Sequence, residues 1–561
     1  MAARFTRRTF AAAVPGGIAA LGGLGAAQAA PGQNPHPAFL AQDATPAGPQ
    51  TIEEFLTPVS GKYDPAIELT TVGIAWPTIV YPEGDDINNN VWKRAYQSKY
   101  GITVTNEWAV PSDQYEQRVN LMLSSGDLPD YFQASPTQFK QLADEDRIMD
   151  VTDVYNNATD RVKNAVTEGG PVPLDSATID GRIMAIPHST VAREGASVLW
   201  VRKDWLEAVG MEPPTTIDEL LAVAEAFVSQ DVNGQGNAVG LGLDNQLGYA
   251  SGFFAGHGAY RGIWLDGSGA LAYSSIQPPV KEALGKLQAL YAAGQIDLEF
   301  GTKNGEALWE DMAAGRIGMY YGSGYDGPIP LGNVKLNFPD SDWYSLPIPS
   351  VTADPAKPMV SLGIAGYWVV NTECQNPAAL PTLIDFWVQA FYDSTLDEVY
   401  DTFNQGPNNN SLWRMNSAQV VKPYKNLNVA KAITAILESG STDTSTLNAE
   451  GRGYYELITS WLNDGNLEGW GWNAIYGPGG AMVEVIDSYV QNDQFVQSAF
   501  YGAPTPAMVS RQSTLDTQEI ETFTRIIQGT SLDEFDAFVE SWKSLGGDDI
   551  TAEVNEWYAS R

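Results

Sequence analysis

Residues 198–228 read VLWVRKDWLEAVGMEPPTTIDELLAVAEAFV and contain the clearest signals of regular structure in the chain. The apolar run 198–201 predicts a buried strand, and a short helix follows it and ends at Gly210. The two prolines after that glycine cannot continue a helix. Thr216 and Glu219 have the spacing of a capping box, so a second helix is predicted to begin there.

Strands also alternate with helices nearer the N-terminus. Strands are predicted at 67–76, 102–110 and 131–132, and helices at 88–100 and 115–126. This order predicts an α/β fold with a parallel sheet covered by helices. Near the C-terminus, Ser531 and Glu534 have the spacing of another capping box and predict a helix that ends at Gly546.

Composition narrows the class of protein. The chain has 561 residues, of which 43% are hydrophobic, so it can bury large cores in several domains. Asp and Glu number 68 against 32 Lys and Arg, and the net charge of -36 makes nucleic acid a poor partner. Cys374 is the single cysteine, which excludes an internal disulfide and a thiolate metal cluster.

Residues 1–30 have the features of an export signal. Arg7 and Arg8 precede a short, weakly apolar run and resemble a twin-arginine (Tat) signal, and 27–30 resemble a cleavage site. Residues 31–60 are rich in Pro, Gln and Ala and predict a flexible leader. No cysteine near the cleavage site could carry a lipid anchor, so we expect a soluble periplasmic or secreted protein.

Residues 322–327 match the glycine pattern of a dinucleotide-binding loop but are not expected to act as one. That loop requires a helix to begin at the last glycine, and Pro328 and Pro330 prevent it. A turn that presents Tyr325 is the better interpretation. Acidic residues are numerous, but no spacing singles out a glycosidase acid and base.

The segment from Asp231 to Asn237 resembles the first half of a calcium-binding loop. Asp231, Asn233, Gln235 and Asn237 offer oxygen ligands, and a glycine stands where the loop must turn. The later acidic ligands are missing, and Gly242 takes the position of the bidentate glutamate. These four residues are therefore candidate calcium ligands, and a metal-free turn is the alternative.

Tryptophan is the most informative residue type for function, because the chain has sixteen. Trp76 ends a predicted strand, and Trp264, Trp470 and Trp472 stand near glycines. Small neighbours leave an indole face open, and sugar rings present C–H faces that stack on such surfaces. The sequence therefore predicts a sugar-binding groove that includes some of these four rings.

Several segments resemble one family along most of the chain. They are 120–131 (NLMLSSGDLPDY), 199–210 (LWVRKDWLEAVG), 214–227 (PTTIDELLAVAEAF), 231–243, 290–300 (LYAAGQIDLEF), 309–320 (WEDMAAGRIGMY) and 535–558 (FDAFVESWKSLGGDDITAEVNEWY). The chain resembles the family 1 solute-binding proteins of ABC importers, and most of all the larger branch that includes alginate oligosaccharide-binding proteins. Members of that branch carry calcium in the loop that matches 231–237.

The resemblance implies an α/β, two-lobed periplasmic-binding-protein fold, type II and maltodextrin-binding-like, with a ligand cleft between the lobes. The expected lobes are 61–190 with 357–455, and 191–356 with 456–561. It implies a monomer that captures an oligosaccharide, performs no catalysis and delivers its ligand to a membrane permease. The alternative is a secreted carbohydrate-active enzyme, a hydrolase or a lyase.

Polar ligand contacts are expected at strand ends and at the crossings between lobes. Ser135 follows a strand, His188 and Arg193 lie at the first crossing, and Tyr325 lies on the turn after another strand. The small number of cations favours a neutral oligosaccharide. An acidic one would need a local cation pair such as Arg193 with Arg261.

Overall fold

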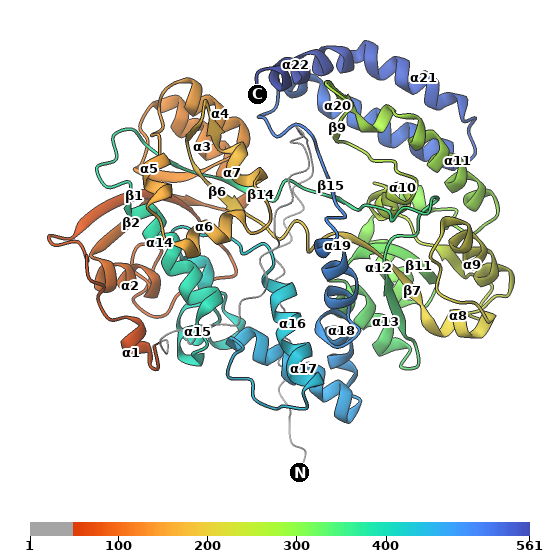
Figure 1. Cartoon of the computed structure of the whole chain (residues 1–561), viewed down its shortest axis with the longest axis horizontal. Helices are drawn as coiled ribbons and strands as arrows, with labels where there is room; N and C mark the ends of the chain where they lie inside the picture. Colours follow the sequence, from red (N-terminus) through yellow and green to blue (C-terminus); the bar gives the residue numbers. More distant parts are fainter. Residues whose placement is uncertain (1–48) are drawn as a thin grey trace.

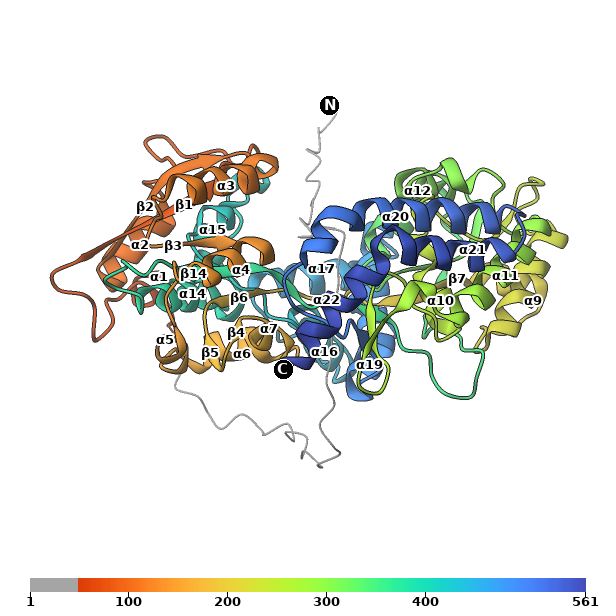
Figure 2. The same cartoon turned by 90° about the horizontal axis from the view of Figure 1, so that it is seen from above.

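The computed structural model describes residues 49–561, and the predicted signal and most of the predicted leader lie outside these residues. Figures 1 and 2 both show two bodies side by side, each with its own sheet and helices. The buried apolar residues fall into clusters that follow the same division. The first body comprises 49–189 and 364–420, and the second comprises 196–360 and 424–561.

The first body contains seven strands and nine α-helices among the described residues. The strands are β1 (Ile67–Ile74), β2 (Ile102–Val110), β3 (Tyr131–Ala134), β4 (Thr178–Ile179), β5 (Arg182–Ile183), β6 (Ile186–Ser189) and β14 (Ile364–Val370). The helices are α1 (Ile52–Phe55), α2 (Val91–Tyr100), α3 (Tyr115–Ser125), α4 (Pro136–Asp144), α5 (Thr152–Asn156), α6 (Asp160–Thr167), α7 (Val172–Ser176), α14 (Ala379–Val388) and α15 (Asp397–Phe403).

The sheet of the first body is only partly parallel, which corrects the prediction for this region. β1 and β2 pair in parallel, as the alternation of strand and helix predicts. β3, however, pairs antiparallel with β14, which also pairs antiparallel with β6. β14 comes from a distant part of the chain, and no local pattern shows that it inserts between β3 and β6.

The second body contains the remaining elements. Its strands are β7 (Ser197–Arg202), β8 (Val239–Leu241), β9 (Trp264–Asp266), β10 (Leu271–Tyr273), β11 (Ile317–Ser323), β12 (Trp343–Leu346), β13 (Met359–Val360) and β15 (Val496–Gln497). Its helices are α8 (Lys203–Val209), α9 (Ile217–Ser229), α10 (Ser251–Gly256), α11 (Pro278–Ala292), α12 (Gly305–Ala313), α13 (Gly332–Asn337), α16 (Lys425–Glu438), α17 (Ala449–Asp464), α18 (Leu467–Tyr476), α19 (Asp487–Gln491), α20 (Pro506–Ile527), α21 (Asp533–Trp542) and α22 (Asp548–Ala559). The central sheet has the order β12-β7-β11-β8.

The predicted signals at 198–228 are confirmed in the second body. β7 is buried along most of its length, and Gly210 ends α8 in the left-handed conformation with φ 68°. Thr216 and Glu219 form both hydrogen bonds of a capping box at the start of α9. The capping box expected at Ser531 is wrong, because its hydroxyl accepts from the backbone N–H of Asp533 and caps no N3 residue.

The packing of α16 differs from the lobe boundary expected at 455. Leu427, Ala430 and Ile433 of this helix are buried with Trp470 and other residues of the second body. The segment 425–455 therefore packs with the second body, whereas the sequence analysis groups it with the first. Three linkers join the bodies, at 190–195, 361–363 and 421–423. Within residues 49–561, no helix has both the length and the apolar character needed to cross a bilayer.

Candidate functional site

The three linkers are held together by hydrogen bonds where they leave the first body. The Ser189 hydroxyl donates to the carbonyl of Val421 at 2.7 Å, and the N–H of Val421 donates to the carbonyl of Ser189 at 3.3 Å. The N–H of Thr190 donates to the carbonyl of Gly363 at 2.9 Å. If the angle between the bodies changes, the backbone must therefore bend within these three neighbouring linkers.

A buried carboxylate on the first linker forms the centre of a polar cluster. Glu194 is 0% exposed and accepts hydrogen bonds from the Tyr325 hydroxyl at 2.6 Å, the Asn426 amide at 2.8 Å and the Leu427 backbone N–H at 2.7 Å. We call these four residues the linker cluster. Burial raises the pKa of Glu194 to about 7, although its hydrogen bonds and Lys425 oppose that shift. The cluster joins the first linker to the start of α16 and to the turn after β11.

An aromatic stack extends from the linker cluster along α17 and α18. The Tyr476 hydroxyl donates to the Asn426 side-chain oxygen at 3.0 Å. The Tyr454 ring is stacked with both Tyr476 and Trp472, at centroid distances of 4.7 Å. Trp472 is only partly buried, so part of its indole is accessible. The stack therefore begins at the linker cluster and ends at a partly buried tryptophan, which stays a candidate for contact with a sugar ring.

Arg193 lies on the same linker, but its contacts are internal. Its guanidinium lies 5.0 Å from the ring centre of Phe495 and 3.6 Å from a carboxylate oxygen of Asp493. Arg261 pairs with a different acid, Glu519, at 2.9 Å. The cation pair considered for an acidic ligand is therefore not formed, because each arginine contacts its own carboxylate.

The first body offers a second aromatic surface. Trp76 follows β1, and the Arg414 guanidinium lies 4.0 Å from its ring centre and 4.8 Å from that of Trp413. We call Trp76, Trp413 and Arg414 the tryptophan–arginine cluster. All three side chains are partly buried, so each retains some contact with solvent. The predicted platform residue Trp76 thus has partners that the sequence analysis did not identify.

Two predicted polar residues of the first body have structural partners. The Ser135 hydroxyl accepts from the N–H of Gln138 at 3.4 Å and caps α4. His188 is 7% exposed, and its Nδ1 accepts from the Gln133 amide at 2.8 Å. Burial lowers the pKa of His188 to about 4, so the ring is neutral at physiological pH. Both residues remain candidate ligand contacts, although each already has a structural role.

Two predicted platform tryptophans are buried in the core, which corrects the interpretation of their glycine neighbours. Trp264 is 2% exposed and packs on Tyr273, within a β9–β10 hairpin whose turn contains Gly269 at φ 111°. Trp470 is 3% exposed. A Cβ on Gly471 would lie 2.6 Å from the Gly327 carbonyl oxygen, so glycine permits close backbone packing there and does not open the ring to ligand.

The segment from Asp231 to Asn237 does not fit a calcium site. The Asp231 carboxylate accepts from the N–H of Gly236 at 2.8 Å, and the Asn233 amide donates to the side-chain oxygen of Asn237 at 2.8 Å. The oxygens of Asp231 and Asn237 are thus used within the loop. Asp231 is the single carboxylate of the four ligands proposed from the sequence, whereas a calcium cage requires six to eight oxygen ligands. Gln235 donates its own N–H to Asn233 at 3.1 Å. The loop has the bonding of a self-contained turn.

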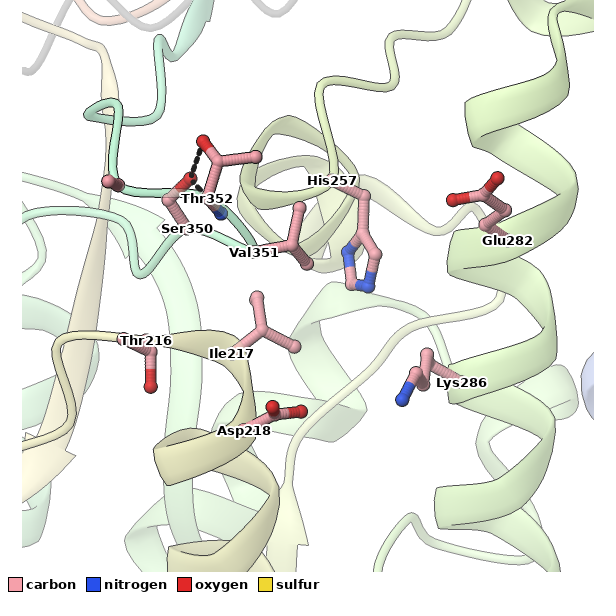
Figure 3. Close-up of a pocket in the computed structure, with 10 residues that line it drawn as sticks. Thr216, Ile217, Asp218, His257, Glu282, Lys286, Ser350, Val351 and Thr352 are labelled. Atoms are coloured by element: carbon pink, nitrogen blue, oxygen red, sulfur yellow. Dashed lines mark hydrogen bonds between the residues drawn. The ribbon is translucent and has the colours of Figure 1, made fainter.

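A cavity of about 520 Å³ lies elsewhere in the second body, between α9, α11 and residues 350–353 (Figure 3). The His257 ring projects toward it, and its Nδ1 lies 2.9 Å from the carbonyl oxygen of Phe253. Asp218 and Lys286 contribute charged side chains to its walls. None of the residues predicted to bind ligand lines this cavity. The aromatic surfaces at the linkers and on the first body therefore remain the candidate site.

Several residues of this site were not predicted from the sequence, among them Glu194, Trp413 and Arg414. Glu194 lies four residues after the lobe boundary expected at 190, and nothing in its local pattern marks it as buried. Trp413 and Arg414 lie in a short polar segment without clear periodicity. The Trp413-Arg414 pair itself is the signal that could have found them, because adjacent indole and guanidinium groups are typical of binding surfaces.

Comparisons with known proteins agree with this architecture. A family model described as bacterial extracellular solute-binding protein matches residues 80–393. The polygalacturonan/rhamnogalacturonan-binding protein YtcQ of Bacillus subtilis is 24% identical over 277 residues, which cover 46% of this chain and 50% of YtcQ. The fructooligosaccharide ABC transporter substrate-binding protein FusA of Streptococcus pneumoniae is 28% identical over 163 residues, covering 27% and 30%. The chain spans half or less of the length of these relatives.

Solved structures confirm the expected two-lobed α/β fold. An HMO binding ABC-transporter associated solute binding protein from Bifidobacterium longum infantis aligns with a TM-score of 0.61 at 17% identity, covering 88% of this chain and 98% of that one. The alginate-binding protein AlgQ2 aligns with a TM-score of 0.52 at 16% identity, covering 90% and 99%. Because the family model spans more than half of the chain, the protein belongs to the bacterial extracellular solute-binding proteins.

Proposed function

We propose that the protein captures an oligosaccharide outside the cytoplasm and delivers it to the membrane permease of an ABC importer. Membership of the extracellular solute-binding family supports this proposal. FusA, one of the relatives, is named as the substrate-binding protein of a fructooligosaccharide ABC transporter, and YtcQ is named for binding polygalacturonan and rhamnogalacturonan. The ligand of this chain is proposed to share their general chemistry, that of a chain of sugar rings.

The observation that carries the proposal is the partly buried Trp472 at the end of the aromatic stack that begins at the linker cluster. Its indole is stacked with Tyr454, whose ring stacks in turn with Tyr476, and Tyr476 is hydrogen-bonded to Asn426 of the linker cluster. An aromatic face held in this way suits the C–H face of a sugar ring. A ligand that contacts both this stack and the first body would favour one angle between the bodies, which is how a two-body protein signals that it is loaded.

The protein is proposed to bind sugar without cleaving it, because transport requires capture and release of an intact ligand. The competing function is a secreted hydrolase or lyase. Incubation of the purified protein with a panel of oligosaccharides, followed by chromatography, distinguishes the two. Saturable binding without products supports the transport function, and product that accumulates with time in proportion to protein contradicts it.

A thermal-shift screen with the same panel is expected to identify the ligand class. A ligand at a hundred times its Kd stabilises the folded state by about 2.7 kcal/mol and should raise the melting temperature measurably. Trp472→Ala is expected to weaken binding by roughly 1–3 kcal/mol through the loss of its contact face. Trp461→Ala is the matched control, since Trp461 is also partly buried and its ring contacts the Lys335 ammonium at 5.1 Å. Equal affinities for both variants and the wild type would contradict the role of Trp472.

Export, solubility and a monomeric state belong to the same proposal. The predicted signal at 1–30, without a cysteine for a lipid anchor, supports release into the periplasm or the medium. Fractionation of cells that express the full chain, with a variant in which Arg7 and Arg8 are both replaced by Lys, tests the export route. Light scattering of the purified protein tests the monomeric state.

A further inference from the structure

The tryptophan–arginine cluster contains an arginine in an unusual electrostatic position. Among the arginines in 49–561 that are buried or partly buried, Arg414 is the one without a carboxylate oxygen within 4.0 Å. The others all form ion pairs, as expected in a chain with more than twice as many acidic as basic residues. Arg414 therefore lacks a carboxylate partner although the protein is rich in acidic residues, because aromatic residues occupy its surroundings.

The surroundings of Arg414 desolvate part of its charge without neutralising it. The guanidinium carbon lies 4.0 Å from the Trp76 ring centre and 4.8 Å from the Trp413 ring centre, so indole faces supply the favourable contacts. Its Nε is buried and has no hydrogen-bond partner. Burial lowers the pKa of Arg414, and the group still remains charged at neutral pH. Because the buried Nε is closed to a ligand, the two terminal amino groups are left to bond a group that the described residues do not supply.

The backbone on both sides of the cluster is fixed. The N–H of Val80 donates to the side-chain oxygen of Asn410 at 3.1 Å, and the Asn410 amide donates to the carbonyl of Val80 at 2.5 Å. These bonds tie the segment after Trp76 to the segment that precedes Trp413. The two indoles and the guanidinium are therefore held in place before any ligand arrives, which lowers the entropic cost of binding.

The cluster continues toward the linkers. The Trp413 ring lies 6.0 Å from that of Phe391, and the Lys425 ammonium lies 6.0 Å from the Phe391 ring centre. Lys425 is the first residue of α16 and adjoins Asn426 of the linker cluster. A ligand several sugar units long could follow this row from the first body to the aromatic stack of the second.

We propose that Trp76, Trp413 and Arg414 form a subsite for a carboxylated sugar unit, with the indoles contacting the ring and the guanidinium pairing with the carboxylate. The inference rests on the proposed function and names the class of its ligand. A guanidinium matches a carboxylate with two parallel hydrogen bonds, and partial burial strengthens that pairing. The low number of Lys and Arg favoured a neutral sugar in the sequence. We revise that preference, because the number of cations does not show which of them lacks an acidic partner.

Matched trisaccharides test the subsite. Isothermal titration compares galacturonotriose with galactotriose, and mannuronotriose with mannotriose, since each pair differs chiefly by carboxylate in place of hydroxymethyl. At least one acidic trisaccharide is expected to bind ten times or more tightly than its neutral partner. That advantage should shrink as the salt concentration rises from 50 to 300 mM. Equal affinity within both pairs, or binding of neither acidic sugar, overturns the inference. If another sugar of the panel binds in that case, the proposed function still stands.

Variants separate the charge from the stacking. Arg414→Met is expected to lose tenfold or more in affinity for the acidic sugar and to change affinity for the neutral sugar by less than threefold. Arg414→Lys should recover part of the loss. Arg118→Met is the matched control, because Arg118 lies over the Trp108 ring at 5.4 Å but is exposed. An equal loss for both sugars in Arg414→Met would show a structural role and overturn the subsite, as would full affinity for the acidic sugar.

Discussion

Replacement of Glu194 by Gln tests whether the linker cluster holds an ionised carboxylate at high pH. Glu194 is fully buried between the first linker and α16, and burial raises its pKa from 4.5 to about 7. The interval between these values, at about 1.4 kcal/mol per pH unit, corresponds to about 3 kcal/mol. Gln keeps the size of the side chain and removes the titration.

The sign of the effect follows from proton binding. Between pH 4.5 and 7 the unfolded chain has lost the proton of this carboxyl, while the folded chain retains it. The free energy of unfolding of the wild type therefore falls by about 3 kcal/mol as the pH rises through this interval, and stays lower above it. Glu194→Gln lacks this contribution. The free energy of unfolding of the variant minus that of the wild type is therefore expected to rise by about 3 kcal/mol between pH 4.5 and 7. A pH-independent effect of the substitution does not alter this rise.

Urea unfolding of both proteins at pH 4.5, 6 and 8 measures this difference. Because two bodies can unfold separately, the transition should be followed by hydrogen exchange of peptides that cover α16 as well as by fluorescence. Glu306→Gln removes a carboxylate from an exposed position on α12 and controls for the change in net charge. Parallel stability curves for the wild type and Glu194→Gln would refute the reasoning, since the carboxyl would then titrate alike in both states.

Two further predictions concern the buried tryptophans and the candidate calcium loop. Trp264→Ala and Trp470→Ala are each expected to lower the free energy of unfolding by about 3–5 kcal/mol, because both indoles are buried; urea titration measures this, and a loss of ligand affinity without a loss of stability would contradict it. Calcium at 1 mM is expected to leave the melting temperature unchanged relative to EDTA, since Asp231 and its neighbours bond one another; a rise that Asp231→Asn abolishes would restore the calcium hypothesis.

Local elements of this fold were predictable because their signals are contained in a few adjacent residues. The strand at 102–110 and the capping box at Thr216 were both placed correctly from sequence. The box expected at Ser531 failed for an equally local reason: the hydroxyl bonds the N–H two residues ahead in place of three. Capping-box spacing therefore predicts that a helix begins nearby, but it does not fix the residue at which the helix begins.

The candidate site was less predictable because its contacts join distant parts of the chain. Trp76 was identified from its place at a strand end, but its partner Arg414 lies in another segment of the first body. Glu194 and the Leu427 N–H that it bonds are 233 residues apart. Such contacts depend on how the two bodies and their linkers assemble, and periodicity or turn chemistry contains no information on that assembly.

A glycine beside a tryptophan can have two physical causes, as α18 shows. Glycine beside tryptophan predicts an open ring when the missing side chain leaves space for a ligand, and Gly471 stands beside both Trp470 and Trp472. At Gly471 the space is already filled by the backbone at Gly327, and the adjacent Trp470 is buried as a result. Both tryptophans lie on α18, two residues apart, so they point to different sides of one helix. The same glycine thus brings the backbone of α18 close to the turn after β11, where Tyr325 bonds Glu194, while Trp472 remains only partly buried.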